Sequence, residues 1–237
     1  MYRTEQYAGK YFSVLGDSIS TLAGYHPLDC AVFYEWEQKR AAGIYCPEDT
    51  WWGRVIDALG GKLLVNDSFS GSMVTKHPAC QIESYGCSDT RTGRLGISTQ
   101  DPDVIMVLLG LNDFGAGVPL HTFAVEKDLS VFSVAYGTML AKLRRNYPMA
   151  EIWCLTLPQS CWRSQPDFEA PLCRSGGHLT AYCDVIWNCA VQNGCRVVDI
   201  ARSGVRYDTI DGYHPNAEGM QTIADAVLHA LEKEGSV

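Results

Sequence analysis

Five short apolar runs recur along the chain, and polar, glycine-rich residues follow most of them. The runs are Tyr11–Leu15, Lys62–Val65, Val104–Leu109, Ile152–Leu157 and Arg196–Ile200. They are rich in β-branched, aliphatic and aromatic residues, and most are apolar almost throughout, which is typical of strands covered on both faces. The pattern therefore predicts five buried strands.

Stretches with apolar residues on one helical face lie between these strands. We expect helices at Thr50–Leu59, Glu126–Arg145, Leu179–Val191 and Ala217–Leu231. Asp49 or Thr50 can act as the N-cap of the first helix, and Gly60 follows its last turn as a C-cap. Alternation of strand and helix predicts an α/β fold, with a parallel sheet, right-handed crossovers and helices on both faces.

Length and composition fit one α/β domain. The 237 residues, of which 46% are hydrophobic, can bury a full core, so we expect residues 1–237 to form a single domain. No run is long and apolar enough to span a membrane, and the polar start lacks the apolar region of a signal peptide, which predicts a cytoplasmic protein. The net charge of −8 argues against a nucleic-acid partner.

The ten cysteines show neither a C-x-x-C pair nor zinc-ligand spacing. Without a secretory signal, free thiols are favoured over a disulfide framework. We expect no metal ion and no cofactor.

A candidate catalytic triad is spread over two of the polar segments. Ser18 follows the first strand after Gly16 and Asp17, which allow a tight reversal of the backbone. A serine hydroxyl needs a base oriented by a third group, and His214 with Asp211 three residues earlier supplies both. The competing assignments are Ser20 for the nucleophile and Asp208 for the carboxylate.

Acyl transfer also needs hydrogen-bond donors for the oxyanion that forms in the tetrahedral intermediate. The candidates are the backbone amides of Ser18 and Gly71 and the side-chain amide of Asn112. Gly71 has no side chain, so its backbone can approach a ligand closely. We expect the neighbouring Asp113 to hold loop backbone instead.

These segments, taken in order, resemble the four blocks of the SGNH hydrolases, also called GDSL-type hydrolases. The matching residues are Gly16-Asp17-Ser18-Ile19-Ser20, Gly71, Gly110-Leu111-Asn112-Asp113 and Asp211-x-x-His214-Pro215. The resemblance implies a three-layer α/β/α flavodoxin-like fold with a five-stranded parallel sheet in the strand order 2-1-3-4-5. It assigns Ser18, Asp211 and His214 as the triad. Leu111 stands where many members carry threonine, and the block around Gly71 is looser than usual.

Two long stretches, Ala23–Asp49 and Gln159–His178, leave the carboxyl ends of strands and should form walls of the substrate pocket. They supply Tyr25, Trp162 and Arg163 as candidate substrate-binding residues. The predicted partner is a small-molecule ester with a small acyl group of the acetyl type. A carbohydrate ester is the leading candidate, since the family often removes acetyl groups from sugars and no broad apolar lid is present.

Other functions stay open. A lysophospholipase, a thioesterase or an acyltransferase could use the same triad. A noncatalytic carbohydrate- or lipid-binding protein is the alternative from another class, because a fold does not fix a function.

Overall fold

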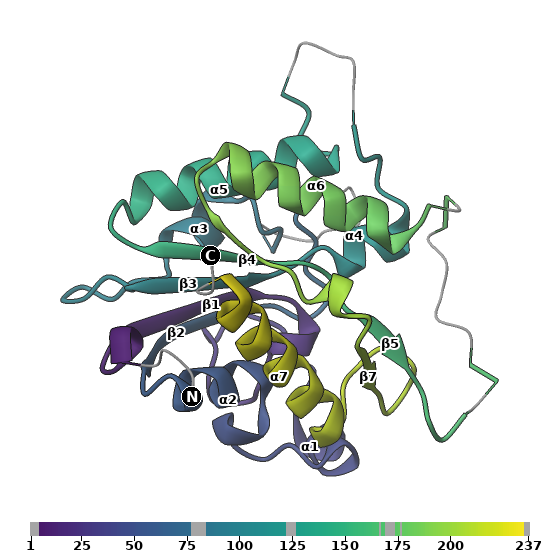
Figure 1. The fold of residues 1–237 in the computed structure, drawn as a ribbon. Helices are drawn as coiled ribbons and strands as arrows, with labels where there is room; N and C mark the ends of the chain where they lie inside the picture. Colours follow the sequence, from purple (N-terminus) through teal and green to yellow (C-terminus); the bar gives the residue numbers. More distant parts are fainter. Residues whose placement is uncertain are drawn as a thin grey trace.

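A parallel sheet forms the centre of the molecule (Figure 1). The computed structural model describes residues 5–76, 84–121, 127–165, 167–168, 174–175 and 177–234. The strands of the main sheet are β1 (Tyr11–Gly16), β2 (Lys62–Ser68), β3 (Val104–Leu108), β4 (Glu151–Leu155) and β6 (Arg196–Val198), in the order β2-β1-β3-β4-β6. This confirms the predicted order, with β6 as the predicted fifth strand.

A second, two-stranded parallel sheet lies beside the first. It pairs β5 (Gln159–Cys161) with β7 (Arg206–Asp208). The sequence patterns predict neither strand, because three residues are too few for a period-two pattern to stand out. The sheet sits at the edge where the main strands end, and it carries the chain toward His214.

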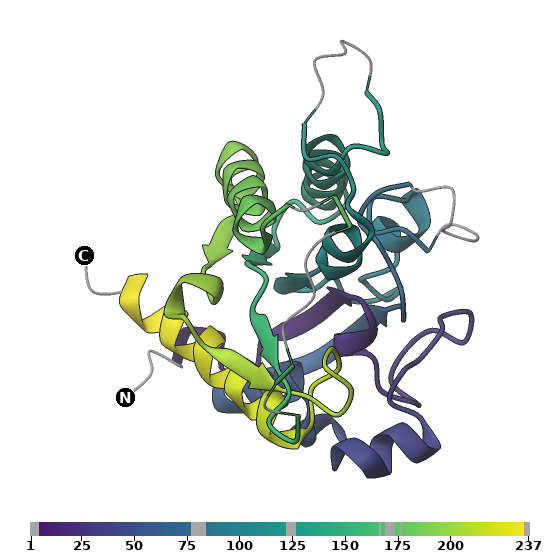
Figure 2. The same ribbon diagram turned by 90° about the vertical axis from the view of Figure 1, so that its right-hand side faces the viewer.

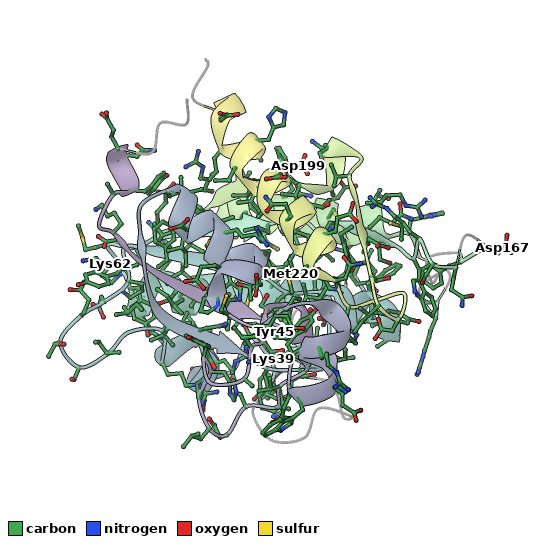
Figure 3. The ribbon with its side chains drawn as sticks, turned by 90° about the horizontal axis from the view of Figure 1, so that it is seen from below. Lys39, Tyr45, Lys62, Asp167, Asp199 and Met220 are labelled. Atoms are coloured by element: carbon green, nitrogen blue, oxygen red, sulfur yellow. The ribbon has the colours of Figure 1, made fainter. Side chains whose placement is uncertain are left out.

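Helices cover both faces of the main sheet and give three layers. The layer below the sheet in Figure 1 holds α1 (Trp36–Ala42), α2 (Trp51–Ala58) and α7 (Ala217–Glu234). The layer above holds α3 (Asp89–Gly93), α4 (Leu111–Ala116), α5 (Phe132–Asn146) and α6 (Leu179–Gln192). Figure 3 shows the lower layer from outside, with α7, which carries Met220, packed beside α2. No helix of the described residues is both long and apolar enough to cross a membrane.

The helix predicted from Glu126 begins later, at Phe132. Glu126 itself lies outside the described residues. Ahead of the helix, the Asp128 carboxylate accepts hydrogen bonds from the amide and the hydroxyl of Ser130 at 2.9 and 2.6 Å, which makes a turn. The first amides of α5 then donate to the carbonyls of Pro119 and Leu120. Local hydrogen bonding therefore overrides the helical pattern of residues 127–131.

The register of the central strands brings their carboxyl ends to one level. Gly16 at the end of β1 pairs with Ser68 of β2 on one side and with Leu108 of β3 on the other. Segments that continue from these three residues must therefore converge. Figure 2 looks onto this edge, where α4 and the β5–β7 sheet lie in front of the strands.

The described cysteines are free thiols. Five of these eight are buried, and none forms a disulfide. Cys80 and Cys173 lie outside the described residues. The core is otherwise aliphatic and aromatic, and it includes the Trp51 and Trp52 pair at the start of α2.

Candidate active site

Ser18 stands in a short 3₁₀ turn (η2, Ser18–Ser20) directly after β1. The Asp17 carboxylate caps this turn by accepting a hydrogen bond from the Ile19 amide at 3.1 Å. The indole N–H of Trp51 donates to the Ser20 hydroxyl at 3.0 Å, so the competing serine is engaged in the core. Ser18 is 8% exposed and its hydroxyl faces the imidazole of His214.

Ser18, His214 and Asp211 form a continuous chain of hydrogen bonds. The Ser18 Oγ lies 3.0 Å from Nε2 of His214, and Nδ1 of His214 lies 2.7 Å from Oδ2 of Asp211. The other Asp211 oxygen accepts from the amides of Tyr213 and His214 at 2.9 and 2.8 Å. Ser18, far away in sequence, thus meets the Asp211–His214 pair in the geometry expected of a nucleophile, a base and an orienting carboxylate.

The alternative carboxylate, Asp208, is used elsewhere. It accepts hydrogen bonds from the Arg163 amide at 2.9 Å and from the Asn216 side chain at 2.8 Å. The structure therefore brings Asp211, and not Asp208, to the imidazole.

Contacts from a distant loop hold the segment between β7 and α7 at His214 and Pro215. The hydroxyl of Tyr34, on the long loop after β1, donates to the carbonyl of Pro215 at 2.7 Å. Its neighbour Phe33 lies flat against the His214 ring, with 3.4 Å between ring centroids and 11° between planes. The sequence predicts that the stretch carrying Phe33 and Tyr34 forms a wall of the pocket, but it gives no local signal for these two contacts, which span about 180 residues.

Burial and hydrogen bonding shift the pKa values of the pair in the directions a triad needs. Burial lowers the pKa of His214 below its usual value, although the hydrogen bond and charge of Asp211 oppose the shift. Burial works to raise the pKa of Asp211, but hydrogen bonds from His214 and Tyr213 outweigh it and hold that pKa below its usual value. At neutral pH the imidazole is thus free to accept a proton beside an ionised carboxylate.

The oxyanion candidates gather at the same edge of the sheet. Gly71 has a φ of 79°, in the left-handed region that favours glycine, and nothing lies within 4 Å of where its Cβ would be. The Asn112 side-chain nitrogen donates to the Ser72 carbonyl at 2.9 Å. An amide nitrogen carries two hydrogens, so the second can point to a substrate oxygen. The Asn112 side chain, in the first turn of α4, is thereby tied to the loop that carries Gly71.

Asp113 binds loop backbone, as the sequence predicts. Its carboxylate accepts from the amides of Val74 and Thr75 and from the Thr75 hydroxyl at 2.7 to 3.1 Å. The oxyanion loop and the start of α4 are therefore fixed relative to each other.

A buried arginine connects the end of β1, next to Ser18, to the loop that carries Gly71 and Ser72. The side chain of Arg91, on α3, is fully buried and pairs with Asp67 at 3.0 Å. It also donates to the Gly16 carbonyl at 3.0 Å and to the Ser72 hydroxyl at 2.8 Å. Sequence reasoning missed Arg91, since it lies outside every motif. A buried guanidinium with this many acceptors holds both loops at a set spacing.

A cavity of about 520 Å³ opens over Ser18. This volume is in the range of small-molecule sites. Its lining includes Ser18, Gly71, Asn112 and His214, together with the apolar side chains of Met73, Leu111, Phe114 and Leu179 and the polar side chains of Gln159, Arg174 and His178. Ser18 and His214 therefore share one cavity with the oxyanion candidates, and its wall is mostly apolar.

The three predicted substrate-binding residues lie outside this lining. Trp162 packs edge-on against Phe168 with 5.7 Å between ring centroids, and Arg163 forms an ion pair with Glu218 of α7. Tyr25 is exposed and packs against α2. After β5, the Arg163 amide donates to Asp208 and its side chain pairs with Glu218 in the first turn of α7. The residues of that long stretch that line the cavity are Gln159 and Ser160 at its start and Arg174, Gly177 and His178 near its end.

The described residues contain no group of three His, Cys, Asp or Glu side chains that could hold a metal ion. The oxyanion candidates described above are all hydrogen-bond donors.

Comparison with known families identifies the class of protein that this fold and site define. Residues 10–160 match the GDSL-like lipase/acylhydrolase family, and the chain belongs to it. No curated protein matches the sequence.

Solved structures share the whole fold. A Bacteroides uniformis protein described as a GDSL-like lipase is 27% identical, with a TM-score of 0.70, over 93% of this chain and 94% of that one. A Bacteroides ovatus protein described in the same way is 24% identical, with a TM-score of 0.74, over 95% of this chain and 99% of that one. An acetylxylan esterase from Geobacillus stearothermophilus is 18% identical, with a TM-score of 0.57, over 95% of each chain.

Proposed function

We propose that this protein is a serine esterase that removes small acyl groups of the acetyl type from carbohydrate esters through an acyl-enzyme. One observation carries the proposal. The Ser18 hydroxyl lies 3.0 Å from His214, whose other ring nitrogen lies 2.7 Å from Asp211, and this chain opens into a cavity.

In the first half of the reaction, His214 Nε2 accepts the Ser18 proton as Oγ attacks the ester carbonyl. Asp211 accepts the Nδ1–H of the ring, holds the tautomer and stabilises the imidazolium. The developing oxyanion takes hydrogen bonds from the amides of Ser18 and Gly71 and from the Asn112 side chain. A first-turn amide such as that of Ser18 has no acceptor within its helix, so it is available for this role.

In the second half, the imidazolium gives its proton to the leaving alcohol, and the acyl group stays on Ser18. Water then enters, His214 takes one of its protons, and the carboxylic acid leaves with the serine restored. Each donor to the oxyanion contributes about 100- to 1,000-fold to the rate.

The choice of substrate rests on the cavity and on the family. Acetylated carbohydrate is supported by the names of two structural neighbours, the acetylxylan esterase and a family 2 carbohydrate esterase from Corynascus thermopiles. The apolar lining at Met73, Leu111 and Phe114 favours a second candidate, the cleavage of longer acyl esters or thioesters.

A labelling experiment tests the nucleophile. A fluorophosphonate probe should label the native protein once, and Ser18→Ala should abolish both labelling and hydrolysis of 4-nitrophenyl acetate. Ser20→Ala is the matched control for labelling, and its probe adduct should remain. Persistent labelling of Ser18→Ala would show that another serine reacts.

The same assay separates the other functions. A transferase would release 4-nitrophenol faster when an acceptor alcohol is added, whereas a binding protein would give neither a burst nor turnover.

A further inference from the structure

One wall of the catalytic cavity carries two side chains that the proposed reaction does not use. Arg174 and His178 both line the cavity. Within the described part of the chain, no acidic side chain is paired with Arg174. His178 precedes α6, and its imidazole makes no capping hydrogen bond there. Among the described residues, neither side chain has a hydrogen-bond or ion-pair partner.

Helix α4 separates these two residues from the catalytic groups. Asn112 lies in its first turn, and Leu111, Phe114 and Ala116 along it line the cavity. At the other end, the Gly117 backbone approaches the chain beside Arg174 so closely that a Cβ would lie 2.9 Å from the Ser175 amide nitrogen. A helix rises about 1.5 Å per residue, which places about 8 Å of wall between the two ends.

The described carboxyl groups that line the cavity do not neutralise the charge of the Arg174 guanidinium. Among the described residues that line it, Asp17 alone carries a carboxyl group, and that carboxyl is buried and caps the Ser18 turn. The chain as a whole has a net charge of −8, so a cation facing a catalytic cavity runs against the overall charge. Such a cation favours a negatively charged ligand at that point.

We propose that Arg174 and His178 form a subsite for an anionic group, a carboxylate or a phosphate, on the ester substrate. The scissile ester lies at Ser18, and an apolar portion of the substrate lies along α4 between the two. A guanidinium can bind either anion through two parallel hydrogen bonds. An imidazole can donate one more in either protonation state. The inference rests on the proposed function, because it assigns the substrate class of the same site.

Two matched pairs of esters test the subsite from both sides of the scissile bond. Mono-4-nitrophenyl adipate against its methyl ester places the charge on the acyl group. 4-Acetoxybenzoate against its methyl ester places it on the leaving group, and 4-acetoxyphenyl phosphate replaces the carboxylate with a phosphate. In at least one pair, the charged ester should have the higher kcat/KM by about tenfold, through a lower KM.

Variants at Arg174 test whether this residue causes the preference for the charged ester. Arg174→Gln should bring the ratio of charged to neutral ester to about one, and Arg174→Lys should retain part of it. Arg145→Gln, the same change at the exposed end of α5, is the control and should keep the native ratio. Added salt should also shrink the native preference, because an exposed ion pair is screened.

The outcomes are distinct. A neutral ester that is preferred in both pairs, or a ratio that Arg174→Gln leaves unchanged, would overturn the subsite while the esterase stands. If no ester is hydrolysed, the proposed function fails, and calorimetric binding of adipate and 4-hydroxybenzoate decides the subsite. Binding that Arg174→Gln abolishes would support it, and absence of binding by the native protein would refute it.

Discussion

The orienting carboxylate is the residue of the proposed triad with a competing assignment, because Asp208 and Asp211 are both near His214 in sequence. Only Asp211 reaches the ring, at 2.7 Å. Asp211→Asn keeps a side chain of the same shape but can favour the wrong imidazole tautomer, so we expect kcat to fall about 10,000-fold. Hydrolysis of 4-nitrophenyl acetate measures the loss, and circular dichroism should show an intact fold.

Asp208→Asn is the matched control. Asp208 holds the Arg163 amide and the Asn216 side chain, so its loss should lower the melting temperature and leave kcat within about tenfold. A large loss of kcat with Asp208→Asn and none with Asp211→Asn would assign the triad to the wrong carboxylate.

The flat contact of Phe33 with His214 should set the acid limit of activity. Only the neutral ring can accept the serine proton, so kcat/KM falls as pH drops through the His214 pKa. Burial holds that pKa below its usual value, so the native limb should lie at more acid pH than for a free histidine. Phe33→Ala exposes one face of the His214 ring, so the acid limb of the kcat/KM profile should move to higher pH.

Phe33→Leu distinguishes the effect of burying the His214 ring from the effect of aromatic stacking on it. Leucine keeps most of the apolar volume, so the limb should stay close to the native position if burial causes the shift. The measurement is the pH profile of kcat/KM between about pH 4 and 8, on either side of the ordinary histidine pKa. A limb that does not move in Phe33→Ala would show that the stack has no influence on the base.

At the residue scale, the sequence predicts the triad and the oxyanion candidates but not the residues that support them. Ser18, Asn112 and His214 follow recognisable turns after strands. Phe33 and Arg91 have no such signal, because their roles arise from contacts between distant loops. The path of a long loop also has no signal in the sequence. The sequence therefore predicts that Trp162 lines the cavity, whereas the structure places Trp162 outside the lining.

The packing of α7 against β7 depends on the absence of a side chain at Gly219. A Cβ there would lie 2.1 Å from the carbonyl oxygen of Asp208, and backbone cannot rotate away as a side chain can. Gly219→Ala should therefore lower the free energy of unfolding by about 2 kcal/mol or more. It should also reduce activity, since the displaced segment leads directly to Asp211 and His214. Urea denaturation and the acetate assay measure both.

Gly137→Ala is the control for the same substitution in a helix. A Cβ on Gly137 of α5 would meet nothing within 4 Å, so alanine should stabilise the protein by about 0.5–1 kcal/mol. Equal effects at Gly219 and Gly137 would contradict the close approach of α7 to β7.

At the scale of elements, buried strands in continuous apolar runs and amphipathic helices could be predicted because their pattern reflects burial in the final fold. The main strands and α2, α6 and α7 follow this rule. The start of α5 could not be placed, because the Asp128 turn competes with helix formation through local hydrogen bonds. The β5–β7 pair is too short to have a pattern and forms only through contacts made by the whole chain.

The arrangement of the whole molecule explains why one cavity can hold both the proposed catalytic groups and the proposed subsite. Parallel strands bring Ser18, Gly71 and Asn112 to one edge, whereas His214 lies on the segment between β7 and α7, and α4 extends the site sideways. The reacting groups thus sit at one end of a wall that runs about 8 Å toward Arg174. The length of that wall limits what an acyl chain can bury.

A chain-length series of 4-nitrophenyl esters tests this limit. Acetate and butyrate fit beside Met73 and Leu111, whereas an extended chain of eight or more carbons would press methylenes against the Arg174 guanidinium and desolvate it. We therefore expect kcat/KM to be highest for acyl groups of two to four carbons. Arg174→Leu replaces the cation with an apolar side chain and should shift the optimum to longer chains. Rates of the native enzyme that climb steadily with chain length would instead favour cleavage of long acyl esters such as lysophospholipids.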